Sequence, residues 1–395
     1  MNNTCYIASA GAGKTTLLIS IMKDRLSQIS KPYKKIIFIT FTENNQENIK
    51  KRIRREFGII PSNVIVIGWF TFLMRYWINP YKGDIIDELC GKSIGVCFYS
   101  GKSGVQKQNN GSFISTYKKG DNKAKYLTLS GCNIPSDMLS DFAYQCYRKN
   151  HNALIERLYN ICDSILIDES QDFAGYDFEI IKAIIKTQSI PTIIVGDPRQ
   201  HTYNTHYSKK HKEYCGDMSL FIKEQINTTK KTYIQIDSNT LSKSHRCVTE
   251  ICELASILTK KYPTTAMCDC EICNQKRSQI EHKGCFLIKD GKVDDFINRF
   301  EPVALRWNKT INIHNNIKYV YNFGDSKGDE YDITLIYPTK PILQWIKNSS
   351  SKLADKTISN FYVAITRARF LAVIIVPDDF QYNGGNLRFW EAGYK

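Results

Sequence analysis

Short apolar runs alternate with helix-like segments over the first part of the chain. Residues 4–8 form one such run, and a loop then leads into a helix that carries Leu17, Leu18 and Met22 on its apolar face. Further apolar runs, each followed by a polar, aromatic or acidic segment, cover residues 36–40, 64–67, 164–167 and 192–195. Residues 43–57 read as a charge-rich helix. This alternation predicts an α/β core with a parallel sheet.

The pattern loosens after residue 80 and returns near residue 151. Gly, Ser, Asn and Lys dominate residues 101–125, which is typical of an exposed insertion. A second core is expected after residue 241, with a helix through Ile251 and Leu254, a helix over 361–369, and strands at 319–323, 333–337 and 371–376. The predicted organisation is therefore a first core at 1–79 and 151–240, a small accessory insertion at 80–150, and a second core at 241–395.

Length and charge narrow the class of protein. The chain has 395 residues, which suits two or three compact domains, and a formal charge of +15. That excess favours an anionic polymer as partner, although a solvated lysine-rich surface explains it equally well. No stretch approaches the roughly 20 apolar residues of a membrane span, and no signal peptide is visible. We therefore expect a cytoplasmic protein without a membrane partner.

Residues 8–15 form a phosphate loop, Ala-Ser-Ala-Gly-Ala-Gly-Lys-Thr, between the first strand and the first helix. Gly11 and Gly13 let backbone N–H groups turn toward phosphates, Lys14 reaches the terminal phosphates, and Thr15 offers a hydroxyl to magnesium. A structural glycine loop is the alternative, which the flanking strand and helix disfavour. The segment predicts ATP and Mg²⁺ as cofactors, with the nucleotide bound by Ala10, Gly11, Ala12, Gly13, Lys14, Thr15 and Thr16.

Two adjacent carboxylates, Asp168 and Glu169, follow the apolar run at 164–167. Ligands bind at the carboxyl edge of a parallel sheet, so both side chains are expected at the nucleotide. Asp168 is suited to hold magnesium through water, beside the Thr15 hydroxyl, and Glu169 to polarise the attacking water. An acidic helix cap would explain one of these residues but not both.

The order of the motifs resembles that of superfamily 1 helicases of the UvrD/Rep type, over nearly the whole chain. The motifs are the phosphate loop, Asp-Glu-Ser-Gln-Asp at 168–172, Gly-Asp-Pro-Arg-Gln at 196–200, Ser-Lys-Gly-Asp-Glu at 326–330, and Tyr-Val-Ala-Ile-Thr-Arg-Ala-Arg at 362–369. The resemblance implies two RecA-like P-loop cores that hydrolyse ATP between them and move on single-stranded DNA or on a duplex with a single-stranded tail.

The resemblance also implies roles for residues outside the phosphate loop. Gln200 matches the residue that senses the γ-phosphate, Arg246 an arginine that reaches the same phosphate, and Arg367 the arginine finger. Glu330 matches the contact to the nucleotide sugar. Guanidinium groups brought across a closing interface stabilise charge in the transition state, so closure is the expected coupling step.

A strand-binding track is implied by two further matches. Thr40-Phe41-Thr42 with Arg52 resembles the first strand-contacting motif of the family, and residues 68–71 resemble the second. The candidate DNA-binding residues are Phe41, Thr42, Arg52, Phe70 and Tyr203; each aromatic taken singly could equally belong to a core. The chain departs from the family at 205–206, where Thr-His replaces a Trp-Arg pair, and at 322–324.

The cysteines raise a separate question. With no secretion signal, the 13 cysteines are expected to be reduced thiols. Cys268, Cys270 and Cys273 lie close together, with His282 and Cys285 following, and these side chains are ligands of tetrahedral zinc. The spacing gives only half of a zinc module, so we favour unligated or partly buried cysteines over a zinc site.

Three functions remain open on the sequence. The first is an ATP-driven single-strand translocase and helicase, moving 3′ to 5′ by family resemblance. The second is a DNA-sensing ATPase that regulates a partner nuclease in repair or antiviral defence, as in Gabija, whose helicase subunit is UvrD-like. The third is an inactive interaction module, which intact Lys14, Glu169 and Arg367 disfavour. The short interval between Arg246 and residue 327 leaves no room for a large mobile insertion.

Overall fold

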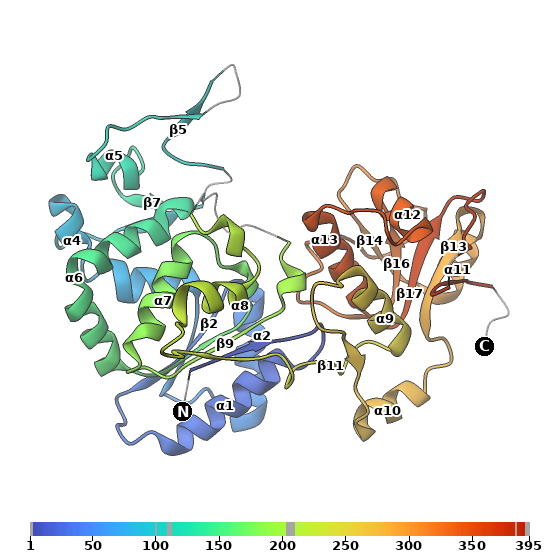
Figure 1. Ribbon diagram of the computed structural model, residues 1–395, viewed down its shortest axis with the longest axis horizontal. Coiled ribbons are helices and arrows are strands. Elements are labelled where there is room, and N and C mark those ends of the chain that lie inside the picture. The colour runs from blue at the N-terminus through green and yellow to red at the C-terminus, as the bar shows by residue number, and fades with distance from the viewer. Residues whose placement is uncertain (1–2, 99–100, 109–112, 203–209, 384, 392–395) are drawn as a thin grey trace. The chain divides into compact units, whose positions relative to one another are not determined.

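The computed structural model describes residues 3–98, 101–108, 113–202, 210–383 and 385–391 (Figure 1). The chain divides into two compact units: the first comprises Met1–Tyr6, Thr15–Gly196 and Asn204–Asp237, and the second Ile7–Lys14, Asp197–Tyr203 and Ser238–Lys395. The phosphate loop up to Lys14 thus groups with the C-terminal part of the chain. Among the helices described, none is long and apolar enough to cross a bilayer.

The first unit contains a six-stranded sheet in the order β10-β1-β9-β8-β2-β3. Its β1–β10, β2–β3, β2–β8 and β8–β9 pairs are parallel. The strands are β1 Thr4–Ile7, β2 Lys35–Thr40, β3 Val64–Gly68, β8 Cys162–Ile167, β9 Thr192–Gly196 and β10 Gln235–Asp237. The helices are α1 Lys14–Gln28, α2 Glu43–Phe57, α3 Trp69–Phe72, η1 Leu73–Ile78, α6 Leu139–Ile161, η4 Ser170–Asp172, α7 Tyr176–Thr187, η6 Lys212–Tyr214, α8 Met218–Phe221 and η7 Ile222–Ile226.

The local sequence explains these elements. Residues 36–39 of β2 and 165–167 of β8 are fully buried, as expected for central parallel strands that helices cover on both faces. Helix α2 begins after Thr42, whose side-chain oxygen accepts a hydrogen bond from the Asn45 N–H at 3.2 Å, and ends at Gly58 with φ +76°. Both ends carry the expected cap chemistry, so the predicted bounds of this helix are confirmed.

The segment between η1 and α6 holds short elements. They are α4 Lys82–Ile85, η2 Asp87–Leu89, β4 Gly95–Cys97, β5 Val105–Lys107, β6 Phe113–Ser115, α5 Asn122–Tyr126, β7 Asn133–Pro135 and η3 Ser136–Met138. Strands β5 and β6 pair antiparallel, and β5 and α5 lie on the side of the unit away from α1 (Figure 1). Lys125 forms an ion pair with Asp141 of α6 at 2.6 Å. Helix α6 itself is kinked at Asn150, where φ is −127°.

The second unit contains a six-stranded sheet in the order β15-β14-β16-β17-β13-β18, with all five pairs parallel. Its strands are β13 Gly284–Lys289, β14 Val303–Arg306, β15 Val320–Asn322, β16 Tyr331–Tyr337, β17 Ala368–Val376 and β18 Arg388–Phe389, and β11 Lys243–Ser244 pairs with β12 Ala266–Met267 outside the sheet. The helices are η5 Pro198–Gln200, α9 Thr249–Leu258, α10 Glu271–Ser278, η8 Asp290–Lys292, α11 Val293–Phe300, α12 Lys340–Lys347 and α13 Asp355–Thr366. The predicted α/β class with two parallel sheets is confirmed.

Two expectations for the second unit need correction. The helix predicted at 361–369 ends at Thr366, and Ala368 already begins β17, because Ala368 and Leu371 pair with residues of β16. Strands β13, β14 and β18 were not anticipated, although β13 is an apolar run that is buried as far as residue 288. The spacing of apolar residues does not distinguish helix from strand in such short segments. Pairing with a neighbouring strand decides which of the two forms.

A buried hydrogen bond anchors the aromatic segment after β3. The Trp69 indole N–H donates to Asp177 Oδ1 at 2.7 Å, and both residues are almost fully buried. Asp177 Oδ2 accepts a second hydrogen bond from the Ala174 N–H. The Trp69 ring also packs against Phe72 and Phe173 at 5.5 and 4.8 Å. Trp69 therefore joins α3 to α7.

Substituting Trp69→Phe should lower the free energy of unfolding by about 2 kcal/mol, because a buried carboxylate loses a donor. Urea denaturation followed by circular dichroism measures this loss. Tyr33→Phe is the control, since Tyr33 is 60% exposed and its hydroxyl can be replaced by water at little cost. A Trp69→Phe protein as stable as the control would contradict the anchoring role.

Candidate active site

Two glycines of the phosphate loop have a left-handed backbone. Gly11 and Gly13 have φ of +71° and +84°, a left-handed conformation that glycine adopts without strain. A side chain at Gly11 would also collide with Arg246 of the same unit, since an added Cβ would lie 2.5 Å from Arg246 Cβ. The Ala10 N–H donates to the Tyr362 hydroxyl at 3.2 Å. Only glycine fits at position 11.

The predicted magnesium ligands lie together in the first unit. The Thr15 hydroxyl donates to Asp168 Oδ2 at 3.0 Å, and Asp168 is 3% exposed at the end of β8. The Asp168 N–H donates to the Ile39 carbonyl, which extends the pairing of β8 with β2. A hydroxyl and a carboxylate oxygen are hard oxygen ligands of the kind that Mg²⁺ takes. The two residues thus fit a magnesium ion.

Glu169 has a strained backbone. Its φ and ψ are 60° and 42°, in the left-handed region that glutamate rarely adopts. Its N–H donates to Asp168 Oδ1 at 2.9 Å, and the Gln171 side-chain amide donates to its carboxylate. The first bond fixes the backbone of Glu169, and the second holds its buried carboxylate. Strain of this kind is concentrated at functional sites, where the surrounding structure maintains it.

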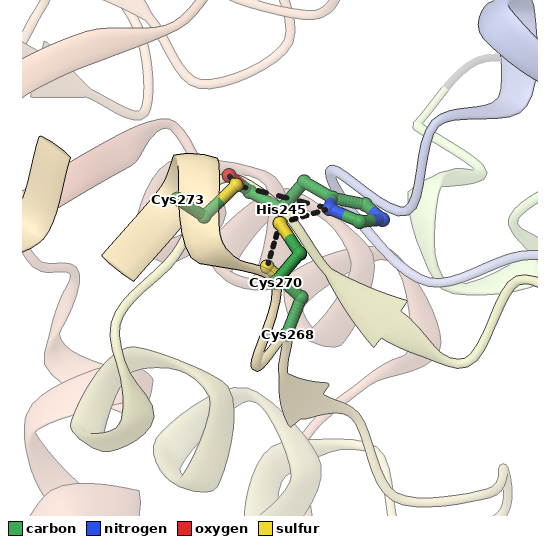
Figure 2. Close-up of side chains that lie close together, drawn as sticks. All are labelled: His245, Cys268, Cys270 and Cys273. Atoms are coloured by element: carbon green, nitrogen blue, oxygen red, sulfur yellow. Dashed lines mark hydrogen bonds between the residues drawn. The ribbon is translucent and has the colours of Figure 1, made fainter. Parts of the chain in front are cut away.

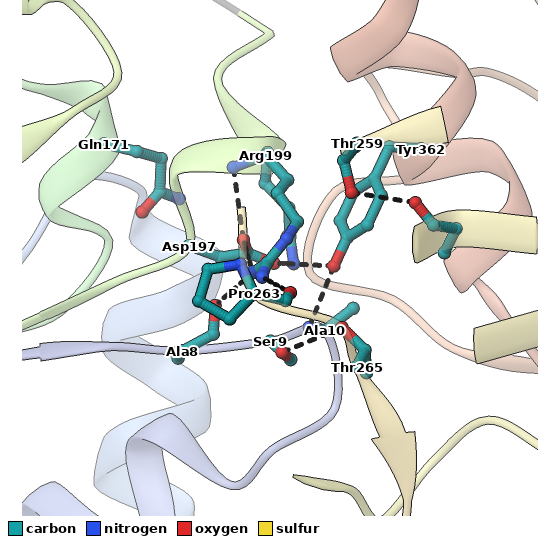
Figure 3. Close-up of polar contacts among 12 residues, drawn as sticks. Ala8, Ser9, Ala10, Gln171, Asp197, Arg199, Thr259, Pro263, Thr265 and Tyr362 are labelled. Carbon is teal, nitrogen blue, oxygen red and sulfur yellow. Dashed lines mark hydrogen bonds and ion pairs between the residues drawn. The ribbon is translucent and has the colours of Figure 1, made fainter. Parts of the chain in front are cut away.

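Asp197 is the centre of a hydrogen-bond network in the second unit (Figure 3). It is fully buried, and its Oδ2 accepts from the Tyr362 hydroxyl at 3.1 Å and from the Gln200 amide at 2.8 Å. Arg199 Nη1 donates to Asp197 Oδ1 at 3.1 Å and to the Ala8 carbonyl at 3.1 Å. Burial raises the pKa of Tyr362 far above its usual range, so the hydroxyl stays neutral and both donates and accepts.

Gln200 joins this network to Arg367. The Arg367 Nη2 donates to Gln200 Oε1 at 3.5 Å. Arg367 is 1% exposed, and its other N–H groups donate to the carbonyls of Val363, Ser326 and Asp329 at 3.3, 3.4 and 3.0 Å. The predicted phosphate sensor and the predicted arginine finger are therefore in contact. Arg367 also holds the 326–329 loop against the end of α13.

Arg246 and Glu330, both predicted at the nucleotide, form an ion pair. Arg246 Nε lies 2.8 Å from Glu330 Oε2, and its Nη1 donates to the Thr366 carbonyl at 3.2 Å. Burial alone would raise the pKa of Glu330, but the charge and the hydrogen bond of Arg246, together with the charges of further arginines, outweigh burial, and the pKa lies below its usual range. The carboxylate therefore stays ionised at neutral pH, and the pair weakens only as the pH falls through this lowered pKa.

The residues predicted for DNA have different surroundings. Phe41 is half-buried and packs against Trp69 and Phe173, while Phe70 is half-buried and faces Phe98, an exposed ring at 6.0 Å. Thr42 is the cap of α2 described above. Arg52 Nη1 donates to the Thr16 hydroxyl at 3.2 Å, beside the start of α1. Tyr203 lies outside the described residues, as do the departures at 205–206.

Sequence reasoning gave no role to Asp197, Arg199 or Tyr362. All three stand inside the quoted motifs, so the positions were visible but their contacts were not. The signal that could have singled out two of them is chemical, because Asp197 and Arg199 are charged residues within three positions of the end of a buried, apolar-rich strand. A charge at such a position is expected to be buried with a partner.

Comparison with known proteins agrees with this geometry. Residues 1–206, more than half of the chain, match the family described as AAA domain, which occurs in UvrD/Rep-type helicases. Over 253 residues the chain is 23% identical to the ATP-dependent DNA helicase Rep of Buchnera aphidicola subsp. Schizaphis graminum (strain Sg), a match that covers 53% of this chain and 37% of that protein. The matched region is thus little more than a third of that relative. The chain belongs to the AAA-domain family of UvrD/Rep-type helicases.

Proposed function

We propose that this chain is an ATP-dependent translocase and helicase of superfamily 1 that moves 3′ to 5′ on single-stranded DNA. The observation that supports it most is the continuous set of hydrogen bonds from Ala10 through Tyr362, Asp197 and Gln200 to Arg367. The phosphate loop and the arginine finger expected at the γ-phosphate then belong to one network. A change at the bound nucleotide is therefore expected to alter the hydrogen bonds of Gln200 with Asp197 and Arg367.

The roles divide by position. Lys14 and the loop N–H groups bind the phosphates, and Glu169 accepts the proton of the attacking water. Thr15 and Asp168 hold magnesium, which screens the phosphate charge when bound. Arg246 and Arg367 stabilise the charge that develops on the phosphate. Glu330 neutralises Arg246 through their ion pair, and the phosphates of a bound nucleotide would offer the same guanidinium a further anionic partner.

The formal charge of +15 and the half-buried ring of Phe70 beside Phe98 support a single strand as the polymer. Positive side chains bind the backbone, and aromatic faces stack on bases of any sequence. The Rep relative is a DNA helicase, which points to the same substrate class. A partner nuclease, as in antiviral defence, is the alternative arrangement, in which DNA serves as the signal rather than the track.

Lys14→Ala and Glu169→Gln should each lower ATP turnover by about 10³-fold or more, because one removes the phosphate-binding ammonium and the other the general base. The Glu169 variant should still bind ATP, as measured by equilibrium binding of a fluorescent analogue. Lys23→Ala is the matched control, since Lys23 is on the same helix but is exposed and pairs with Glu56. Near-normal turnover of Glu169→Gln would show that another group is the base.

Arg367→Ala should lower turnover by about 10³-fold, as expected on losing an arginine finger. Some thermal stability should be lost as well, because the guanidinium bonds three backbone carbonyls. Arg367→Lys keeps the charge and separates the two effects. Arg369→Ala is the control, an arginine two residues away that pairs with Asp332 at the surface. Loss of ATP binding together with loss of the fold would assign Arg367 a structural role only.

Single-stranded DNA should raise ATPase activity, and its affinity should fall with a log–log salt slope of about −0.7 per neutralised phosphate. Phe70→Ala and Tyr203→Ala should reduce this stimulation and leave basal hydrolysis unchanged. Tyr33→Ala, an exposed aromatic outside both motifs, should change neither.

Displacement of duplexes with a 3′ or a 5′ single-stranded tail tests polarity. Equal displacement from both tails, or from the 5′ tail alone, would refute 3′ to 5′ movement. No stimulation by any single strand would refute the motor and leave a protein-regulated ATPase.

A further inference from the structure

Four potential metal ligands converge beside the Arg246 segment. His245 follows β11, Cys268 follows β12, Cys270 caps α10 and Cys273 lies in its first turn. Their ligand atoms all lie within 4.8 Å of one another (Figure 2). Figure 2 shows the three sulfur atoms and the imidazole pointing toward one another. The parallel pairing of β11 with β12 brings the histidine to the cysteines.

The spacing of the atoms is that of a tetrahedral zinc site. Zinc bonds of about 2.3 Å to sulfur and 2.0–2.1 Å to nitrogen place two sulfurs about 3.8 Å apart, and a sulfur and a nitrogen about 3.6 Å apart. Cys268 and Cys270 Sγ are 3.6 Å apart, and His245 Nδ1 lies 3.7 and 3.8 Å from Cys270 and Cys273 Sγ. These contacts are long for hydrogen bonds but match the edges of the tetrahedron.

Surrounding residues support the ligands. Arg277, which is 6% exposed, donates to Cys268 Sγ at 3.4 Å, to the Cys268 carbonyl at 2.7 Å and to the Ser244 carbonyl at 3.3 Å. Three thiolates and one imidazole around Zn²⁺ carry a net charge of −1, which the guanidinium offsets. Hydrogen bonds of this kind orient the ligands of metal sites.

The sequence did not reveal the fourth ligand. His282 and Cys285 follow the three cysteines along the chain, but His282 packs its ring against Phe300 at 4.9 Å and Cys285 is buried in β13. His245 lies 23 residues before Cys268 in the chain. The fourth ligand therefore precedes the three cysteines in the chain instead of following them.

We propose that His245, Cys268, Cys270 and Cys273 bind one structural zinc ion. All four positions of the tetrahedron are then taken by protein, as in structural rather than catalytic sites. The ion fixes the 243–246 segment to α10. The backbone N–H of His245 donates to the Gly11 carbonyl at 2.9 Å, so the site also supports the phosphate loop and the neighbouring Arg246. This last consequence rests on the proposed ATPase function, whereas the zinc site itself does not.

Metal analysis of the full chain, expressed without a histidine tag and refolded with zinc sulfate, should find about one zinc ion per chain. Cys270→Ser and Cys273→Ser should lower this to about 0.1 or less, and Cys132→Ser, an exposed cysteine away from the cluster, should not change it. His245→Cys should retain zinc because it replaces one zinc ligand by another, while His245→Ala should lose it.

Two further measurements cover variants that fold poorly. Cobalt substitution of the wild-type protein should give intense thiolate charge-transfer bands and the visible bands of a tetrahedral ion. A chelator should lower the melting temperature of the wild type but not of Cys270→Ser.

Three results would overturn the proposal: no zinc in the refolded wild type, full zinc in both serine variants, or iron with visible absorption, which indicates an iron–sulfur cluster. Metal content and melting temperature need no ATP turnover, so a wild type that binds zinc but lacks ATPase activity would refute the proposed function alone.

Discussion

The buried carboxylate of Asp197 places a strong constraint on the second unit. A charge taken out of water costs several kcal/mol unless hydrogen bonds replace its hydration, and here the replacement comes from Arg199, Gln200 and Tyr362. These partners come from sequence positions up to 165 residues away. Each is held in turn by another contact, such as that of Tyr362 with the Ala10 N–H. The positions of the proposed phosphate-sensing groups follow from satisfying this one charge.

The core strands could be predicted because buried strands of a parallel sheet are continuous apolar runs in the sequence. Apolar runs such as residues 36–39 have no competing interpretation when a loop and a polar helix follow them. The later part of the chain was harder. The apolar residues around Ala368 are compatible with a helix or with a strand, and pairing with β16 makes this segment a strand. The run at 284–289 is equally apolar, but no flanking motif draws attention to it.

The sequence predicts those residues of the candidate site that belong to a recognisable motif. It does not predict contacts between segments that are distant in the chain. Thr15 and Asp168 could be paired because the phosphate-loop motif assigns Thr15 to magnesium and Asp168 follows a strand at the carboxyl edge of the sheet. The Tyr362 hydroxyl and the His245 imidazole were not assigned, because their partners are set by packing between segments distant in sequence. Two-residue strands such as β11 and β12 leave no periodic signal, yet their pairing brings His245 to the cysteines.

The left-handed backbone of Glu169 has an evolutionary consequence. A glutamate in this conformation costs of order 1 kcal/mol or more, whereas glycine and asparagine adopt it more readily. Selection for stability alone would therefore tend to replace the proposed general base with one of these residues. A homologue with glycine or asparagine at this position and the other site residues unchanged is expected to be more stable but unable to hydrolyse ATP. Substitution at position 169 is thus a simple route from the proposed motor to a nucleotide-binding scaffold.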